Sequence, residues 1–418
     1  MPKLPKQPEI NIGTAGHVDH GKSTLINALT GVWTSAHSEE LKRGITIKVG
    51  YADVAFYKCS SCDSFASYGT EAKCNNCKSK CDLSRVVSFV DVPGHESLMA
   101  NMLSGSALTD GAILVIAANE RVPQAQTQEH LLALQMLGTD QIVIVQNKVD
   151  LVDRNEAMEN FENIKNFVSG TVAENSPIVP ISAQQGINID ALIASIEKTI
   201  ITNKKDMKSS PLMNVLRSFD VNKPGSSIVQ LKGGVIGGSL SQGVLTVGDE
   251  VEIRPGILND NNKKYNSLFT TISSLGTSSG LVDSVNPGGL VAIGTTLDPS
   301  ITKSDSLLGS VVGHPDKLPP VVDSVKIEAE LFDSAVGSNA MTKVGSNTMT
   351  KVDALRKTEF LRLNVGTAVT LGSVTSVNNS TIDLSLRRPI SADVGNRLAL
   401  SRKIDDRWRL IGSGVVCE

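Results

Sequence analysis

The segment Gly16-His17-Val18-Asp19-His20-Gly21-Lys22-Ser23 constrains the fold of this chain more than any other feature. It has the form GxxxxGK[ST], in which glycines allow backbone N–H groups to approach phosphate oxygens. Such a loop needs a strand before it and a helix after it, and the apolar run at 10–15 and the helical pattern at 23–29 meet that need. The sequence therefore predicts a nucleotide-binding α/β domain.

Two residues of this loop have predicted chemical roles. Lys22 is placed to reach the β- and γ-phosphates, where it would also act in catalysis, and the Ser23 hydroxyl is placed to hold Mg²⁺. We expect the neighbouring residues to bind the nucleotide as well. The predicted contacts in this segment are Val18, Asp19, His20, Gly21, Lys22, Ser23 and Thr24.

The segment Asn147-Lys148-Val149-Asp150 indicates which base is bound. A carboxylate at Asp150 can accept hydrogen bonds from the N1–H and N2–H₂ groups of guanine, a pair of donors that adenine lacks. Ser182-Ala183-Gln184 can support the guanine O6 atom through backbone N–H groups, although Ser-Ala pairs are common. We therefore expect GTP and GDP as ligands. The residues predicted to hold the base are Asn147, Lys148, Asp150, Ser182, Ala183 and Gln184.

Residues between these two segments predict a switch that senses the γ-phosphate. Asp91 follows the apolar run 86–90, so its carboxylate should hold a water of the Mg²⁺ shell, while the backbone N–H of Gly94 can donate to the γ-phosphate. Thr46, in the segment 43–47, could complete the Mg²⁺ shell while GTP is bound, and the alternative is an ordinary strand residue. His95 is placed to polarise the attacking water, and the alternative is a loop histidine without a catalytic role.

Six cysteines include two closely spaced CxxC pairs. The pairs are Cys59 with Cys62 and Cys74 with Cys77. Four thiolates at this spacing suit tetrahedral zinc in a closed structural site, so the sequence predicts about one zinc ion per chain. A redox-active pair is the competing interpretation, but such a pair normally occurs once and at the start of a helix. Cys81 lies close enough to compete as the fourth ligand, and Cys417 is left over.

The chain length favours three domains, because 418 residues exceed one ordinary core at about 150 residues per domain. Short β-branched runs alternate with helical patterns from Glu9 to about Ile201, which is typical of a mostly parallel sheet with crossover helices. The runs 113–116 and 142–145 are apolar without alternation, as expected of strands buried on both faces. The predicted helices are 22–29, 126–137, 157–168 and 189–200.

The pattern changes after a polar stretch at 202–206. Short Gly- and Val-rich segments follow, which are typical of β-barrels, and a second break at 313–320 separates two groups of them. The segments are 227–231, 244–247, 250–254 and 290–293, then 325–331, 361–365, 381–386 and 397–401. The predicted fold class is an α/β P-loop GTPase domain plus two antiparallel β-barrels. The predicted domains are 1–205, with a zinc-knuckle insertion at about 57–82, 206–318 and 319–418.

A tandem octapeptide occupies 336–343 and 344–351, and its two copies differ only at Ala340 and Thr348. Two copies are too few for a solenoid, whose units need about three repeats to bury a core. Surface loops tolerate insertions at a small entropic cost. We therefore interpret the repeat as a lengthened surface loop without a chemical role.

Charge and hydropathy exclude two classes of protein. The formal net charge of -3 is not that of a generally basic nucleic-acid binder, so any RNA contact must be local. The apolar runs are far shorter than the ~20 residues of a membrane span, and no signal-peptide pattern begins the chain, so we expect a soluble cytoplasmic protein without a membrane partner. A basic segment near the C-terminus, which includes Arg387 and Arg388, is either an RNA contact or a solvated face.

The nucleotide-binding motifs together resemble those of the translational GTPases, which share a GTP-binding domain and two β-barrels. These motifs are Gly16–Ser23, Arg43–Ile47, Asp91–His95 and Asn147–Asp150. Within that superfamily, the double CxxC insertion and the segment Arg217–Gly225 are similar to those of the gamma-subunit family of archaeal and eukaryotic initiation factor 2. The short segment before the first strand resembles the archaeal members.

This resemblance implies partners and roles that the residues alone do not. It implies a heterotrimer with alpha and beta subunits that binds methionylated initiator tRNA with GTP and delivers it to the small ribosomal subunit, with GTP hydrolysis as the release step. It also implies a second magnesium ion near Asp19 and the backbone of Gly44, which gives Asp19 a catalytic role. Two alternatives share the architecture: an elongation-type or selenocysteine-specific carrier of aminoacyl-tRNA, and the GTPase subunit of sulfate adenylyltransferase.

Overall fold

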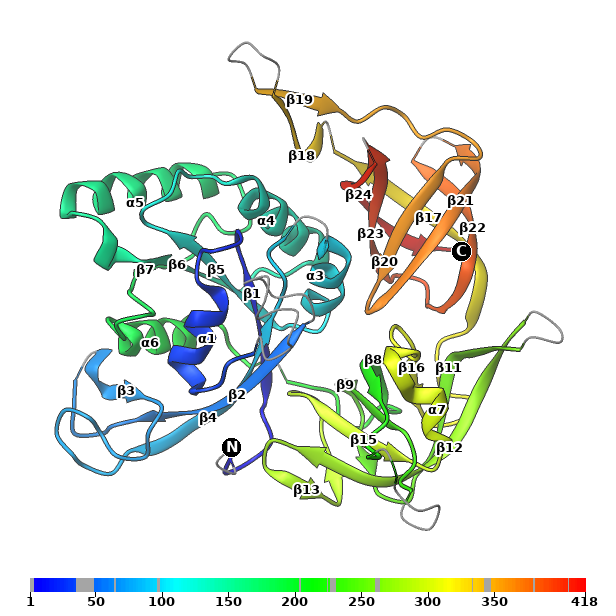
Figure 1. Cartoon of the computed structure of the whole chain (residues 1–418), viewed down its shortest axis with the longest axis horizontal. Coiled ribbons are helices and arrows are strands. Elements are labelled where there is room, and N and C mark those ends of the chain that lie inside the picture. The colour runs from blue at the N-terminus through cyan, green and yellow to red at the C-terminus, as the bar shows by residue number, and fades with distance from the viewer. Residues whose placement is uncertain are drawn as a thin grey trace. The chain divides into compact units, whose positions relative to one another are not determined.

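The computed structural model of the chain is shown in Figure 1. It describes residues 4–34, 49–63, 65–95, 98–202, 204–223, 225, 231–259, 264–332, 334–341, 347–378, 380–404 and 406–418, with the backbone alone for 334–341 and 347–351. The chain divides into two compact units. The sheet unit is Pro8–Asn203 with Ser334–Thr350, and the barrel unit is Met1–Gln7 with Lys204–Asp333 and Lys351–Glu418. Among the described helices, none is long and apolar enough to cross a membrane.

The sheet unit is built on seven strands in the order β3-β2-β4-β1-β5-β6-β7. Strands β4, β1, β5, β6 and β7 run parallel, whereas β2 and β3 form an antiparallel edge. The strands are β1 (Ile10–Ala15), β2 (Gly50–Lys58), β3 (Tyr68–Gly69), β4 (Asp82–Asp91), β5 (Gly111–Ala117), β6 (Ile142–Asn147) and β7 (Ile178–Pro180). The helices are α1 (Lys22–Thr30), α3 (Met99–Ser106), α4 (Ala125–Leu137), α5 (Arg154–Val168) and α6 (Ile189–Thr199). The four predicted helices are present, and α3 was not predicted.

Helices cover both faces of this sheet, which explains the unbroken apolar runs of its central strands. Ile113 and Val115 of β5 pack in one core, and Leu114 and Ile116 pack in the other. Helices α1 and α6 contribute to the first core, and α4 and α5 contribute to the second (Figure 1). The loops that follow β1, β4, β5 and β6 therefore meet at one edge of the sheet, where open α/β folds bind ligands.

The cysteine insertion extends the antiparallel edge of the sheet. Strands β2 and β4 pair as far as Lys58 opposite Asp82, so Cys59 and Cys81 lie at the open end of that pair. Between them, β3 pairs with β2 and a short bridge folds the chain back. This arrangement brings the two CxxC segments together.

The barrel unit contains two antiparallel six-stranded barrels. The ring of the first barrel runs in the order β11-β16-β8-β9-β15-β12, and it closes where β11 pairs with β12. Strand β13 pairs with β12 beside this ring. The ring of the second barrel runs in the order β17-β22-β21-β20-β23-β24, and it closes where β17 pairs with β24. This architecture confirms the predicted fold class.

The strands of the first barrel are β8 (Leu212–Phe219), β9 (Val235–Gln242), β11 (Glu250–Asn259), β12 (Lys264–Thr277), β13 (Gly280–Val282), β15 (Val291–Thr295) and β16 (Val311–Gly313). Beside them lie β10 (Leu245–Thr246), β14 (Ser284–Val285) and the short helix α7 (Pro299–Thr302). The strands of the second barrel are β17 (Val321–Leu331), β20 (Phe360–Val365), β21 (Ala368–Asn378), β22 (Thr381–Ser391), β23 (Arg397–Ile404) and β24 (Arg407–Cys417). Every predicted barrel segment overlaps a strand except 227–231, of which 227–230 lie outside the described residues.

The tandem octapeptide is largely extended. Strands β18 (Ser334–Met341) and β19 (Asn347–Lys351) pair as a two-stranded sheet, and 342–346 lies outside the described residues. The interpretation of the repeat as a loop is therefore wrong for these two segments. Two adjacent extended segments can satisfy each other's backbone N–H and C=O groups, which a solvated loop leaves to water.

Arg85 on β4 connects the end of α6 to the sheet. Its guanidinium donates to the carbonyl oxygens of Ile196 at 3.2 Å and Ile200 at 2.7 Å, and it pairs with the carboxylate of Glu197. The Ile200 carbonyl lies just beyond the last residue of the helix, where backbone acceptors lack helical donors, whereas the Ile196 carbonyl also accepts the backbone N–H of Ile200 at 2.9 Å. The side chains of Arg85 and Glu197 are 8% and 11% exposed, so one nearly buried guanidinium donates to these carbonyls, to the Glu197 carboxylate and, at 3.3 Å, to Oγ1 of Thr202.

Replacing Arg85 with methionine should destabilise the sheet unit by roughly 3 kcal/mol, because a nearly buried carboxylate loses its cationic partner and the Ile200 carbonyl loses its donor. Urea unfolding followed by circular dichroism measures the change. The matched control is Arg154→Met at the exposed start of α5, which should cost less than about 0.5 kcal/mol. Equal stability of Arg85→Met and the wild type would contradict this role.

Candidate functional site

Glycines set the shape of the loop between β1 and α1. Gly16 has a φ of 134° and Gly21 a φ of 90°, in the region that favours glycine. A Cβ at Gly16 would lie 2.2 Å from the carbonyl oxygen of Val115, and a Cβ at Gly21 would lie 2.4 Å from Nδ2 of Asn147. Helix α1 begins directly after Gly21, which supplies no side-chain cap, and its first turn carries no acidic residue. The first N–H groups of α1 are therefore suited to bind phosphate.

Lys22 is buried beneath the loop. Its Nζ donates to the carbonyl oxygen of Gly16 at 3.0 Å and to that of His17 at 2.6 Å. Burial lowers the pKa of Lys22 to about 8, and the nearby carboxylates of Asp91 and Asp19 oppose that shift. The loop's own carbonyl groups thus hold a cation at the place where the motif predicts phosphate binding.

Asp91 at the end of β4 is fully buried and accepts hydrogen bonds from three hydroxyl groups. The donors are Ser23 Oγ at 2.6 Å, Thr14 Oγ1 at 3.1 Å and Thr34 Oγ1. Burial raises the pKa of Asp91, and these donors and Lys22 oppose the shift. Carboxylate and hydroxyl oxygens are ligands that Mg²⁺ prefers, so Ser23 and Asp91 fit a magnesium site.

Gly94 brings the segment after β4 onto the phosphate loop. A Cβ at this position would lie 2.4 Å from Lys22 Nζ and 3.1 Å from the backbone nitrogen of Val18. A side chain here would displace the ammonium group of Lys22 and press against the backbone of the loop, so glycine permits the close approach of the two segments. His95 follows as an exposed residue, and its catalytic role stays a prediction.

Asn147 connects the phosphate loop to the predicted base-binding loops. Its Nδ2 donates to the carbonyl oxygen of His20 at 2.9 Å, and its Oδ1 accepts from the backbone N–H of Ala183 at 3.0 Å. Ala183 is buried, whereas the carboxylate of Asp150 is exposed three residues after Asn147. One amide therefore fixes the spacing between three loops.

Two buried histidines, His20 within the phosphate loop and His130 of α4, hold the loop through their Nδ1 atoms. His130 of α4 accepts the backbone N–H of Gly16 at Nδ1, at 2.9 Å, and burial lowers its pKa well below the usual value. His20 lies 2.9 Å from the carbonyl oxygen of Val115 through Nδ1, and burial lowers its pKa to about 3. The sequence prediction missed His130, because one histidine within a helical pattern gives no signal of its loop contact.

The remaining predicted site residues lie around this network. Val18, Thr24 and Lys148 are half-buried, and Lys148 Nζ lies 3.9 Å from the carboxylate of Glu120, which was not predicted. Asp19 and Gln184 are exposed, and Ser182 is buried. Gly44 and Thr46 lie outside the described residues. Glu120 could have been found from its position just after the apolar strand β5.

The sulfur atoms of four cysteines form a second cluster. The cluster consists of Cys59, Cys62, Cys74 and Cys77. All four Sγ atoms lie within 4.8 Å of one another, with 3.4 Å between Cys59 and Cys77 and 3.7 Å between Cys62 and Cys74. Tetrahedral zinc with Zn–S bonds of about 2.3 Å places sulfurs about 3.8 Å apart, so the cluster fits this ion. Cys81 is not in the cluster, and burial raises the pKa of its thiol to about 11.

Comparison with known proteins matches both ends of the chain to translation factors. Residues 7–202 match the elongation factor Tu GTP binding domain, and residues 323–416 match the C-terminal domain of initiation factor eIF2 gamma. Translation initiation factor 2 subunit gamma of Archaeoglobus fulgidus is 55% identical over 98% of this chain and 94% of its own length. The chain belongs to this gamma-subunit family. It is thus a translational GTPase, which hydrolyses GTP to GDP and phosphate.

Other members of the gamma-subunit family agree with this assignment, and two solved structures share the fold. The subunits of Methanocaldococcus jannaschii and Pyrococcus abyssi are 53% and 52% identical, each over 99% of this chain and 98% of their own length. A bacterial selenocysteine-specific elongation factor, EF-Sec, has a TM-score of 0.71 at 24% identity, covering 98% of this chain and 58% of that one. Elongation factor SelB of Methanococcus maripaludis, in complex with the GTP analogue GppNHp, has a TM-score of 0.71 at 22% identity, covering 99% and 80%. At these low sequence identities, the two structures show a likeness of fold alone.

Family membership confirms the resemblance drawn from the nucleotide motifs and the cysteine insertion. It favours the gamma-subunit interpretation over a selenocysteine-specific carrier and over the subunit of sulfate adenylyltransferase. The identity extends over nearly the whole chain, so it includes both barrels as well as the nucleotide-binding region.

Replacing His130 with glutamine should remove part of the acid sensitivity of the sheet unit. The unfolded imidazole takes up a proton near pH 6.5, whereas the buried ring does not, so the wild type loses stability as the pH falls from about 7 to about 5. The glutamine amide oxygen can accept the N–H of Gly16 and does not titrate. The variant should therefore lose about 2 kcal/mol less than the wild type over this range, measured by urea unfolding.

The control for this measurement is His314→Gln, at a half-buried position in the barrel unit. It should leave the pH dependence of the sheet unit unchanged. Identical pH dependence of the wild type and His130→Gln would show that burial of His130 does not contribute.

Proposed function

We propose that this gamma subunit carries methionylated initiator tRNA to the small ribosomal subunit in the cytoplasm, in a heterotrimer with alpha and beta subunits. The observation that carries the proposal is 55% identity to an initiation factor 2 gamma subunit over 98% of the chain. We assign residues 1–205 to the GTP-dependent switch, and 206–318 and 319–418 to barrels whose surfaces contact the tRNA and the other subunits.

The contacts at the phosphate loop support its assigned role. Backbone N–H groups of the loop and of α1 bind the phosphates, and Lys22 moves its hydrogen bonds from the carbonyls of Gly16 and His17 to the β- and γ-phosphates. Asn147 keeps this loop at a fixed distance from Ala183, whose backbone supports guanine O6. Asp150, exposed beyond Asn147, accepts the two guanine donors.

Ser23 and Asp91 support the assignment of a magnesium site. Their side-chain oxygens lie 2.6 Å apart and belong to the class that Mg²⁺ binds. We assign Ser23, Asp91 and Thr46 to one ion, and Asp19 with the backbone of Gly44 to a second. When bound, magnesium neutralises the charge of the phosphates. Without the ion, the hydrogen bond from Ser23 to Asp91 joins the start of α1 to the end of β4.

Hydrolysis requires a positioned water, because phosphoryl transfer depends mostly on orientation and charge stabilisation. We assign the orientation of this water to His95. The water oxygen bonds to the γ-phosphorus, the bond from that phosphorus to the β–γ bridging oxygen breaks, and GDP and phosphate are the products. Gly94 then loses its contact with the γ-phosphate, which frees its segment and lowers the affinity for tRNA.

Initiator tRNA binding should follow the nucleotide that the base site accepts. The wild type with alpha and beta subunits should bind methionylated initiator tRNA tightly with a non-hydrolysable GTP analogue, and more weakly with GDP or with elongator methionyl-tRNA. Asp150→Asn should require the corresponding xanthosine analogue, because the new amide can donate to the C2 carbonyl of xanthine. Filter binding with each nucleotide measures both effects.

This experiment tests the role of Asp150 and the carriage of initiator tRNA separately. Unaltered GTP-dependent binding in Asp150→Asn would contradict the role of Asp150 and leave tRNA carriage standing. Equal affinity of the wild type for initiator and elongator tRNA would contradict the carriage of initiator tRNA. Glu156→Gln, at an exposed position on α5, is the matched control for loss of a carboxylate and should behave as the wild type.

We propose that the cysteine cluster holds one structural zinc ion. Elemental analysis of the purified wild type should find about one zinc per chain. Cys77→Ser should lose most of it, because one of four thiolate ligands is removed, whereas Cys81→Ser should retain it. Absence of zinc from the wild type, or equal loss in both variants, would contradict this ligand set.

A further inference from the structure

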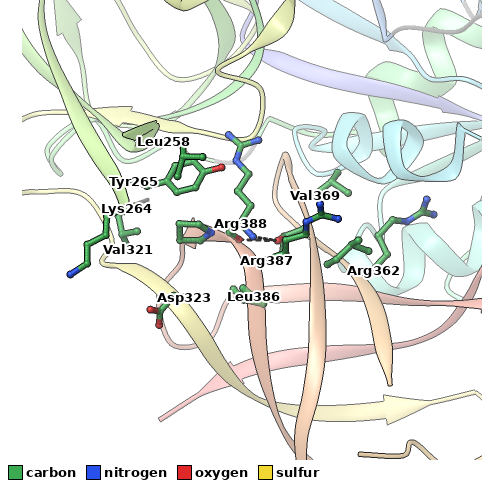
Figure 2. A pocket seen from close by; sticks show the side chains of 13 residues that line it. Leu258, Lys264, Tyr265, Val321, Asp323, Arg362, Val369, Leu386, Arg387 and Arg388 are labelled. Atoms are coloured by element: carbon green, nitrogen blue, oxygen red, sulfur yellow. Dashed lines mark hydrogen bonds between the residues drawn. The ribbon is translucent and has the colours of Figure 1, made fainter. Parts of the chain in front are cut away.

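A hollow of about 830 Å³ lies between the two barrels of the barrel unit. Residues of β11 and β12 line it from the first barrel, and residues of β17, β20, β21 and β22 line it from the second. In Figure 2, Leu258 and Tyr265 lie on one side, Arg362 and Val369 lie on the other, and Arg388 lies between them. The volume is within the ~300–1,000 Å³ range of small-ligand sites, and none of its lining residues belongs to the nucleotide or cysteine sites.

An irregularity in β22 places two adjacent arginines on this hollow. Between the pairs Val322–Ile390 and Ser324–Ser385, β17 advances by two residues and β22 by five. In a regular strand, adjacent side chains point to opposite faces, so Arg387 and Arg388 could not both line one hollow. The bulge removes that restriction. The hydroxyl of Thr370 accepts from the backbone N–H of Arg388 and donates to its carbonyl, which holds the bulged backbone.

The lining is strongly cationic. Its basic residues are Lys264, Arg362, Arg387 and Arg388. Asp323 is the one acidic residue among the described residues that line the hollow. Within the described part of the chain, the guanidinium groups of Arg362, Arg387 and Arg388 form no ion pair. Arg362 stacks over the ring of Trp408 at 5.1 Å, and its buried Nε has no hydrogen-bond partner among the described residues.

The rest of the lining selects among anions. Guanidinium groups bind phosphate oxygens in a forked geometry, and a desolvated arginine without a carboxylate partner favours an anionic ligand. Tyr265 offers an aromatic face, and Leu258 and Leu386 add apolar surface. A small inorganic anion would leave these apolar groups uncovered. A base with its ribose would cover them, since aromatic side chains stack on bases of any sequence.

We infer that this hollow binds a nucleoside phosphate unit, with its phosphate on the arginine side chains that line it and its base against Tyr265, as a second site separate from the GTP site. The unit can come from a single strand of RNA or from a free nucleotide. Both sources share the chemistry that the hollow recognises, and they differ in whether neighbouring nucleotides add affinity.

Fluorescence anisotropy with fluorescein-labelled decauridylate tests the inference, with the full chain saturated by GDP and magnesium so that the GTP site is filled. Wild-type protein should bind this probe, and Arg388→Glu should weaken binding by about tenfold or more. Tyr265→Ala should weaken it by roughly fivefold through loss of stacking. Arg388→Gln, which adds no repulsive charge, should also weaken it and replaces Arg388→Glu if that variant does not fold.

The matched control is Arg397→Glu, which makes the same charge change at an exposed position on β23 that does not line the hollow. It should bind the probe within about twofold of the wild type. Displacement of the probe by uridine 5′-monophosphate would identify a free nucleotide as a ligand, and displacement by unlabelled decauridylate alone would identify a strand. The inference would be overturned if the wild type did not bind the probe, or if Arg388→Glu bound it as well as the wild type does. It would also be overturned if Arg397→Glu weakened binding as much as Arg388→Glu, or if inorganic phosphate displaced the probe as well as uridine 5′-monophosphate.

Discussion

The amide side chain of Asn147 is the contact on which the nucleotide site depends. It donates to the phosphate loop at His20 and accepts from Ala183, so one planar group fixes two loops relative to the strand that carries it. Gly21 allows this approach, because any side chain there would meet Nδ2 at 2.4 Å. The phosphate and base regions are therefore held at a set separation by the protein itself, and a ligand that spans both pays little ordering cost on binding.

Burial determines the charge states around this contact. Lys22, Asp91 and His130 are withdrawn from water, and burial shifts each pKa in the direction that disfavours charge. The two histidines that support the loop are neutral, so they fix its backbone without competing with Lys22 for phosphate oxygens. Asp91 retains its acceptor role through three hydroxyl donors, which a metal ion can replace as partners of the carboxylate.

Sequence patterns predicted those features that repeat along the chain or fill a motif. Such patterns predicted the strand and the helix that flank the phosphate loop, and they predicted the buried strands β5 and β6. They also predicted the cluster of four cysteines. Helix α3 was missed because its eight residues include Gly and Ser, which are weak helix formers. Thr34 and His130 were missed because their roles arise from contacts between distant segments, which a linear pattern does not encode. The pairing of β18 with β19 was missed for the same reason.

The irregular stretch of β22 has a consequence for how the second barrel can vary. Leu384 and Ile390, on either side of it, are both fully buried, so the strand stays packed at both ends of the extra residues. Substitutions at the intervening positions alter what the outer wall presents while the packed scaffold stays the same. The fold thereby separates the residues that maintain the domain from those that determine its surface chemistry, and this chemistry can change without rebuilding the domain beneath it.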